Sequence, residues 1–265
     1  MQTADRRRFN GPEGARPPRF NKTASLANDA ASTWRQDGRT PSQIRPIFMQ
    51  TGLVSDASGS VYIETGRTKV ICAVHGPKPT APSVAFSPRA RLNVEVKFAP
   101  FSSGIRRFAP GKDTESLTLS SAVHQAIIPS LLLEALPKSQ IDLFLTILES
   151  DGNDDDIAAG ITAASVALAK AGIPMRGLVV ATSAALLSRC PTQAFFDPAL
   201  AEARNSIAFA TIACLPALGT ITSLTTTGSF PMIVLEETLE TAVKICGQLH
   251  GVAKQALLDD SNEDL

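Results

Sequence analysis

The residues whose types and spacing could do chemistry gather in one turn, where Asp151 and Gly152 precede three consecutive acids, Asp154, Asp155 and Asp156. Carboxylates can act as general acids and bases or as metal ligands. A simpler interpretation is that acids at a helix start interact favourably with its free N–H groups and its dipole. Neighbouring residues on a helix point in different directions. We therefore favour helix capping over a three-carboxylate metal site.

A second group of candidate residues is basic and indicates contact with nucleic acid. Arg106 and Arg107 lie in a segment that we expect to be a flexible loop, and Lys112 follows a Pro-Gly turn. Such side chains can contact nucleic-acid phosphates without reading base sequence, although a solvated surface pair is an equally good interpretation of the two arginines. Arg89 and Arg91 are further candidates. With one Trp and one Tyr, the chain offers few stacking platforms beyond Phe, so we expect weak, sequence-blind, salt-sensitive contacts.

The metal-binding residue types are too scattered to form a site. The chain has four cysteines and three histidines: Cys72, Cys190, Cys214, Cys246, His75, His124 and His250. They show no zinc-ligand spacing, and the cysteines stand in apolar contexts, which is typical of buried free thiols in a reducing compartment. We expect no metal and no cofactor.

The composition is that of an ordinary globular protein of 265 residues, 44% hydrophobic and 19% charged. Its zero net charge argues against a protein that binds nucleic acid over its whole surface. No apolar run reaches the roughly 18 residues of a membrane-spanning helix. The opening residues MQTADRRRFN lack the apolar stretch of a secretory signal, so we expect neither feature.

The elements that must position these side chains follow from hydrophobic periodicity and from glycine and proline breaks. We expect strands at residues 61–64, 69–75, 91–98, 140–148, 177–187, 206–215 and 220–225, and helices at residues 116–128, 157–171 and 236–258. Because strands and helices do not alternate strictly, the fold class is α/β or α+β, with mixed sheets packed against helices in a single domain. We place this domain at residues 33–258. A disordered, basic extension at residues 1–32 precedes it and an acidic tail at residues 259–265 follows it.

Short motifs along this domain resemble the RNase PH family over about residues 34–258. They are Arg35-Gln36-Asp37-Gly38-Arg39, Arg45-Pro46-Ile47, Ala57-Ser58-Gly59-Ser60, Gly66-Arg67-Thr68-Lys69-Val70, Val74-His75-Gly76-Pro77, Asp151-Gly152 and Gly172-Ile173-Pro174. Each is weak alone, because such turn and cap residues are common, but their order is specific. The resemblance implies an RNase PH-like fold before it implies a function.

The resemblance also locates three positions where active family members carry catalytic groups. Where they have paired arginines after a Pro-Gly turn, this chain has Thr114 and Glu115. Their phosphate-binding turn corresponds to residues 153–156, three of which are acidic here, and Phe209 stands at the position of their catalytic Asp. Phosphorolysis must bring a phosphate ion beside the RNA backbone, which requires cations or N–H donors. We therefore expect no catalytic residue in this chain.

What the family implies for function is a place in a six-membered ring. Relatives form the ring of the eukaryotic RNA exosome, largely without catalytic activity, so the resemblance predicts a non-catalytic subunit of a hetero-oligomeric ring. Its partners are other RNase PH-like subunits, cap subunits and RNA. It implies RNA and rRNA processing and degradation in the nucleus, including the nucleolus, and in the cytoplasm, with Arg106 and Arg107 near the central pore.

Two alternatives stay open. One is an active phosphorolytic 3′-to-5′ exoribonuclease, for which Asp197 and Glu202 are imperfect substitutes for the missing acid. The other is a free-standing RNA-binding protein, which predicts a basic domain and is disfavoured by the zero net charge.

Overall fold

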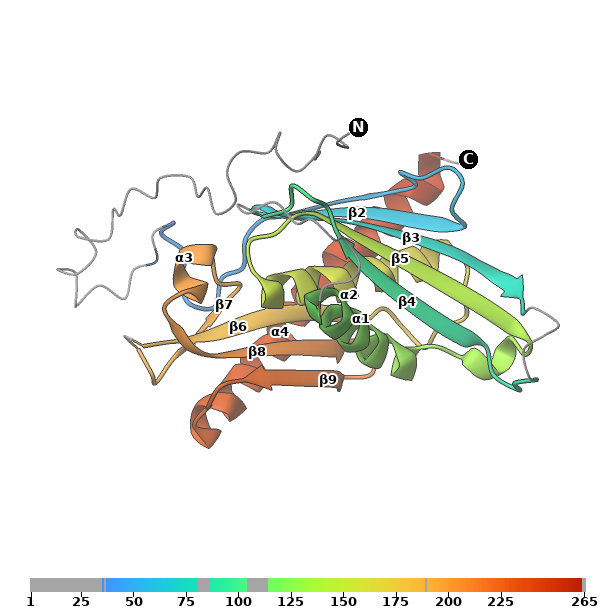
Figure 1. Ribbon diagram of the computed structural model, residues 1–265. Coiled ribbons are helices and arrows are strands. Elements are labelled where there is room, and N and C mark those ends of the chain that lie inside the picture. The colour runs from blue at the N-terminus through green and yellow to red at the C-terminus, as the bar shows by residue number, and fades with distance from the viewer. Residues whose placement is uncertain (1–34, 36, 81–85, 104–113, 189, 264–265) are drawn as a thin grey trace, which may run out of the picture. The chain divides into compact units, whose positions relative to one another are not determined.

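Alternating apolar residues build a five-stranded sheet in the computed structural model, which describes residues 35, 37–80, 86–103, 114–188 and 190–263 (Figure 1). Its strands are β1 (Ile47–Thr51), β2 (Gly59–Thr65), β3 (Thr68–Pro79), β4 (Arg91–Phe98) and β5 (Ser139–Glu149). Their order is β1-β2-β3-β5-β4, and β4 pairs with β5 in parallel while the other pairs are antiparallel. Every second residue of β3 from Thr68 to Gly76 is buried, as the period of a strand requires.

A second sheet has four antiparallel strands in the order β7-β6-β8-β9. They are β6 (Val180–Leu187), β7 (Ala194–Phe196), β8 (Ser206–Leu215) and β9 (Thr220–Thr227). The short helix α3 (Leu200–Ala203) connects β7 to β8. Residues in β6 and β8 are buried on both faces, so this sheet has a covering layer on each side.

Helices α1 (Thr114–Ile127) and α2 (Asn153–Lys170) lie between the two sheets. Helix α2 contacts β2 and β3 of the first sheet and β6 and β8 of the second, and nearly all its residues from Asp155 to Leu168 are buried. A helix that is buried all round needs small apolar residues, which explains its alanine-rich sequence. The core therefore lies on both sides of α2.

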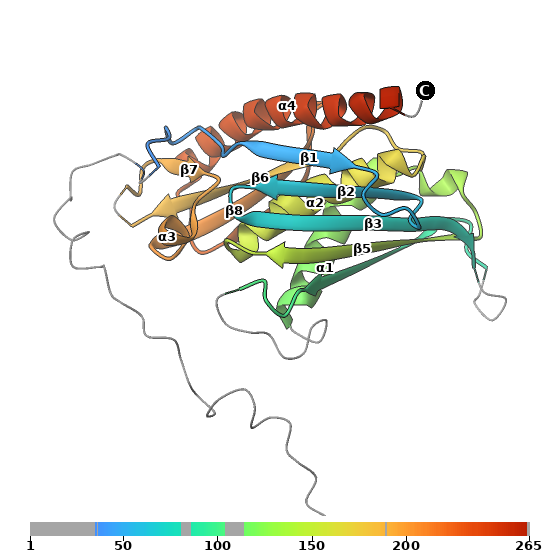
Figure 2. The same ribbon diagram turned by 90° about the horizontal axis from the view of Figure 1, so that it is seen from above.

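The last helix, α4 (Met232–Glu263), packs on the opposite face of the second sheet and runs past β1 (Figure 2). Its Val234 contacts Leu186 and Ala208, and its Cys246 lies against the Val180 carbonyl. The resulting layers, sheet, helices, sheet and helix, confirm the expected fold class of mixed sheets packed with helices.

Several expected boundaries were wrong. Strands β1 and β7 and helix α3 were not anticipated, because three to five residues give too little periodicity to recognise. Helix α2 begins at Asn153 rather than at residue 157. Helix α4 begins at Met232 and continues to Glu263, so most residues expected to form an acidic tail extend the helix. Continuing an existing helix costs little once it is nucleated, even where acids oppose its dipole.

In the part of the chain that the structure describes, no helix combines the length and apolar character needed to cross a membrane.

Candidate functional site

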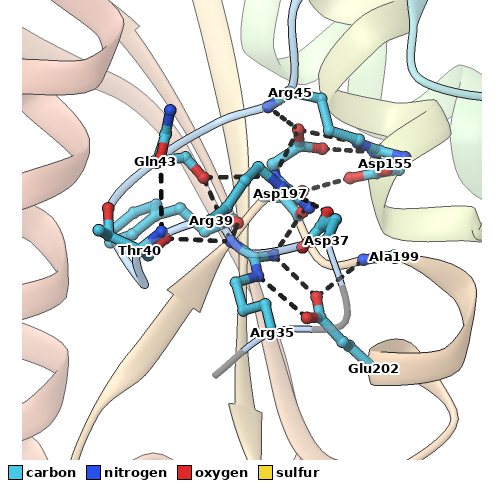
Figure 3. A network of polar contacts seen from close by, with 12 residues as sticks. Arg35, Asp37, Arg39, Thr40, Gln43, Arg45, Asp155, Asp197, Ala199 and Glu202 are labelled. Atoms are coloured by element: carbon cyan, nitrogen blue, oxygen red, sulfur yellow. Dashed lines mark hydrogen bonds and ion pairs between the residues drawn. The ribbon is translucent and has the colours of Figure 1, made fainter. Parts of the chain in front are cut away.

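The centre of the candidate site is Arg45, whose buried guanidinium contacts three carboxylates (Figure 3). Its Nη1 donates to Asp151 Oδ2 at 2.7 Å, and its Nε donates to Asp197 Oδ2 at 2.9 Å. Its Nη2 donates to both Asp155 and Asp197. The main-chain N–H of Arg45 also donates to Asp197 Oδ2, at 2.7 Å. One cation thus joins the end of β5, the first turn of α2 and the loop after β7.

Burial and ion pairing act on Arg45 in opposite directions. Burial disfavours its charge, but the hydrogen bond and charge of Asp197, followed by those of Asp151, outweigh it and raise the pKa of the guanidinium above its ordinary value. Arg45 is therefore charged at every physiological pH. Removing it would leave three buried carboxylates without their cation.

Two more arginines hold the loop after β7 against the segment that precedes β1. Arg35 makes a bidentate pair with Glu202, at 3.0 and 2.7 Å, and donates to the carbonyls of Phe196 and Asp197, both at 2.8 Å. Arg39 donates to Asp37 at 2.6 Å and to the Asp197 carbonyl at 3.2 Å. Figure 3 shows this network, in which the arginines approach Asp197 from several sides.

Asp197 itself has an unusual backbone. Its φ is +51°, in the left-handed region that aspartate tolerates better than most residues. Its main-chain N–H donates to the Ser183 carbonyl at 2.9 Å, and its carbonyl accepts from Arg35 and Arg39. Hydrogen bonds to the main-chain N–H and to the carbonyl of Asp197 thus hold this residue in its left-handed conformation.

Two of the consecutive acids, Asp155 and Asp156, lie inside the helix rather than at its N-cap. The N-cap residue is Gly152, and it makes no side-chain hydrogen bond. Asp155 accepts instead from Arg45 and from Ser183 Oγ at 2.5 Å, while Asp156 accepts from Ser150 Oγ at 2.5 Å. The two carboxylates point in different directions, as helix geometry predicts, but they bind tertiary partners that the sequence does not reveal.

Phe209 lies near this turn. It is half-buried and lines an open pocket of about 270 Å³ with Asp151, Gly152, Asp155 and Arg204. The fold therefore brings together two of the positions that the resemblance had located separately, the turn after β5 and Phe209 on β8. Strand β8 has no acid between Ser206 and Leu215.

Asp197 and Glu202, the two acids considered as substitutes for a catalytic Asp on β8, are both engaged by arginines. Asp197 binds Arg45, and Glu202 binds Arg35, in contacts with little solvent exposure. Both oxygens of each carboxylate already accept hydrogen bonds from within the protein, so neither carboxylate is available to a substrate without losing these contacts. Neither residue stands free in the pocket beside Phe209.

The other candidates are placed as follows. Thr114 and Glu115 are exposed at the start of α1. Arg89 forms an exposed pair with Glu134 at 2.7 Å, and Arg91 begins β4. Arg106, Arg107 and Lys112 lie outside the described residues, so their expected contact with RNA stays a prediction.

Arg35, Arg39 and Arg45 are the residues of this network whose role sequence reasoning missed. Their motifs had been interpreted as turn and cap residues, whereas the structure makes them the cations of one network. The available signal was three arginines within eleven residues. Their acidic partners after β5 and after β7 lie more than 100 residues away in the sequence, so no local pattern names them.

Comparisons with known proteins agree with this architecture. A family model described as the 3′ exoribonuclease family, domain 1 (RNase PH), matches residues 43–174. The exosome complex component Rrp41 of Pyrococcus furiosus is 38% identical over 224 residues, which cover 84% of this chain and 87% of that protein. The exosome complex component MTR3 of Homo sapiens is 33% identical and covers 96% of this chain and 94% of that protein.

Solved structures show the same fold at low identity. Rice Rrp46 superposes with a TM-score of 0.73 at 23% identity, over 84% of this chain and all of that chain. A chain of the Archaeoglobus fulgidus exosome, solved with RNA bound to the active site, superposes with a TM-score of 0.72 at 20% identity, over 83% of this chain and 92% of that one. Because sequence similarity extends along most of the relatives' length and the folds agree, the chain belongs to the RNase PH (3′ exoribonuclease) family.

Proposed function

We propose that this chain is a non-catalytic structural subunit of an exosome ring. It would hold neighbouring RNase PH-like subunits in place and help to line the channel through which RNA reaches a separate nuclease. The ring assignment is supported by the relatives, since the matched proteins of Pyrococcus furiosus and Homo sapiens are both named exosome complex components. The human protein aligns with 96% of this chain, which supports a subunit of its kind.

The observation that carries the loss of catalysis is the engagement of Asp197 and Glu202 by Arg45 and Arg35. Phosphorolysis needs cationic groups that hold phosphate and an acid that can exchange a proton beside it. By the resemblance Phe209 stands at the acid position on β8, and the nearest substitutes, Asp197 and Glu202, are bound to buried arginines. The side chains beside Phe209 support binding or assembly better than chemistry.

A phosphorolytic 3′-to-5′ exoribonuclease is the second candidate. The family is named for exoribonucleases, and a structural neighbour was solved with RNA bound to its active site. In that case Asp197 or Glu202 would have to leave its arginine when substrate binds.

An RNA decay assay separates the two candidates. The full chain, alone and in the complex isolated from its own cells, is incubated with single-stranded RNA with and without inorganic phosphate. We expect no phosphate-dependent release of nucleoside diphosphates from the isolated chain. Release that is abolished by Glu202→Gln, and retained by the exposed-residue variant Glu134→Gln, would establish the enzyme instead.

Assembly is tested by native mass spectrometry of the tagged chain from its own cells. One copy among several different RNase PH-like chains, with cap subunits and RNA, is the expected result. A homohexamer of this chain would contradict the proposal. We also propose that the complex acts in RNA and rRNA processing in the nucleus, the nucleolus and the cytoplasm, which imaging of the same tagged chain checks.

A further inference from the structure

Two open pockets meet beside the arginine network. One, of about 420 Å³, is lined by Asp37, Arg67, Asp151, Glu202 and Arg204, among others. The other, of about 270 Å³, contains Phe209 and shares Asp151 and Arg204 with the first. The shared residues make the two pockets neighbours along one stretch of surface.

Each acid that lines the larger pocket is paired with an arginine. Asp37 accepts from Arg39 at 2.6 Å, and Asp151 accepts from Arg45 at 2.7 Å. Glu202 accepts two hydrogen bonds from Arg35. Each of these carboxylates is paired with a guanidinium, which offsets much of the negative charge that it presents to a ligand.

Arg67 and Arg204 differ from the buried arginines. Both side chains are exposed and line the same pocket, and within the described part of the chain neither guanidinium makes a hydrogen bond or an ion pair. Their backbones are well held. Arg67 lies in the β2–β3 turn beside Gly66, which packs on the Arg45 side chain, and the Arg204 amide donates to the Leu200 carbonyl at 3.2 Å.

The neighbouring pocket adds an aromatic surface. Phe209 is half-buried on β8 and shares its pocket with Arg204. An arginine and an aromatic ring that line one pocket suit a nucleotide, because the guanidinium can bind its phosphate while its base stacks on the ring. Inorganic phosphate could bind the guanidinium but has no base to stack on the ring.

We propose that Arg67 and Arg204 bind a phosphodiester group of single-stranded RNA, with an adjacent base against Phe209. This inference rests on the proposed function, since it gives the RNA channel a contact on this chain. The described residues of the two pockets and of the arginine network include five arginines and five carboxylates, whose charges balance. The contact is therefore weak, blind to base sequence and sensitive to salt.

Fluorescence anisotropy of a fluorescein-labelled oligouridylate with the full chain tests this site. The double variant Arg67→Gln/Arg204→Gln should bind roughly 5- to 30-fold more weakly at low salt. The slope of log K against log salt should fall by about 0.7 for each RNA phosphate that the variant no longer neutralises. Arg176→Gln, which removes an exposed arginine that lines neither pocket, is the matched control and should change neither quantity.

A photo-crosslink locates the base. RNA that contains 4-thiouridine should label the tryptic peptide that includes Phe209, and the double variant should lose most of this label. Labelling that is equal in both proteins would overturn the site.

The outcomes separate failure of this pocket from failure of the proposed function. If the double variant binds RNA like the wild type while Arg106→Gln/Arg107→Gln binds more weakly, the pocket is overturned and the channel role stands. If inorganic phosphate raises the melting temperature of the wild type only, with RNA affinity unchanged in the variant, the occupant is free phosphate and the inference fails. Whether the chain enters the ring is read independently from native mass spectrometry of the same variants.

Discussion

Arg45 shows how the same residue type can be structural in one place and available for ligands in another. Its guanidinium is buried and saturated by Asp151, Asp155 and Asp197, whereas Arg67 is exposed and unpaired among the described residues. Burial makes the difference, since an isolated buried charge is costly and must find its partners within the fold. Arginine content alone therefore predicts neither RNA binding nor its absence.

Replacing Arg45 tests its structural role. We expect Arg45→Met to lower the free energy of unfolding by about 3–5 kcal/mol, because three buried carboxylates lose their cation. Urea unfolding followed by circular dichroism measures the change. The control, Arg89→Met, breaks an exposed pair with Glu134 and should cost less than about 1 kcal/mol. Equal effects of the two variants would contradict the role assigned to Arg45.

Restoring an acid on β8 tests the loss of chemistry. We expect Phe209→Asp to remain inactive in the phosphate-dependent decay assay, since one carboxylate does not supply the cations that hold phosphate. The variant should also bind RNA more weakly, because it removes a stacking surface and adds a negative charge. Phosphorolysis by this single variant would mean that the other catalytic positions are intact.

At the scale of elements, β2 and α2 approach so closely that a glycine is required between them. A Cβ built on Gly59 would lie 2.3 Å from the Ala167 carbonyl oxygen and 2.6 Å from the Ala171 amide nitrogen. Both are backbone atoms at the end of α2, so no side chain can move aside. The glycine thus sets the spacing between the first sheet and the middle helix layer.

Two glycine-to-alanine variants should have opposite effects. Gly59→Ala should destabilise the protein by about 3 kcal/mol through overpacking. Gly247→Ala should stabilise it by about 0.5–1 kcal/mol, because Gly247 is an exposed position within α4 where an added Cβ would meet no atom within 4 Å. Thermal unfolding of both variants checks the two signs, and a neutral Gly59→Ala would show that the layers can separate.

At the scale of the whole molecule, the network and the layers depend on contacts between distant parts of the sequence. Arg35 and Glu202 are 167 residues apart, and Arg45 and Asp197 are 152 apart. These pairs join the segment before β1 to the loop after β7, while α2 packs between two sheets built from either half of the chain. The cysteines report on this packing, because Cys72, Cys214 and Cys246 are buried and Cys190 is half-buried.

Thiol labelling of the native protein reads out the integrity of the layers. We expect one thiol, Cys190, to react quickly with Ellman's reagent, and the other three to react only after unfolding in guanidinium. Burial raises the pKa of the Cys72 thiol well above its ordinary value, which lowers its thiolate fraction as well as its access. Cys190→Ser should abolish the fast phase, and a remaining fast phase would mean that a core layer opens in the native state.

Strands from β2 to β6, β8 and β9, and helices α1, α2 and α4, could be anticipated from the sequence, because each has a hydrophobic period of its own. The absence of an acid on β8 is likewise a property of the sequence. Only the tertiary structure decided the partners of the charged residues. Asp155 pairs with Arg45 instead of capping α2, and arginines also engage Asp197 and Glu202. The tertiary structure likewise places Arg67 and Arg204 in one pocket. Periodicity is local along the chain, whereas charge pairing depends on which distant residues the packed layers bring within hydrogen-bond distance.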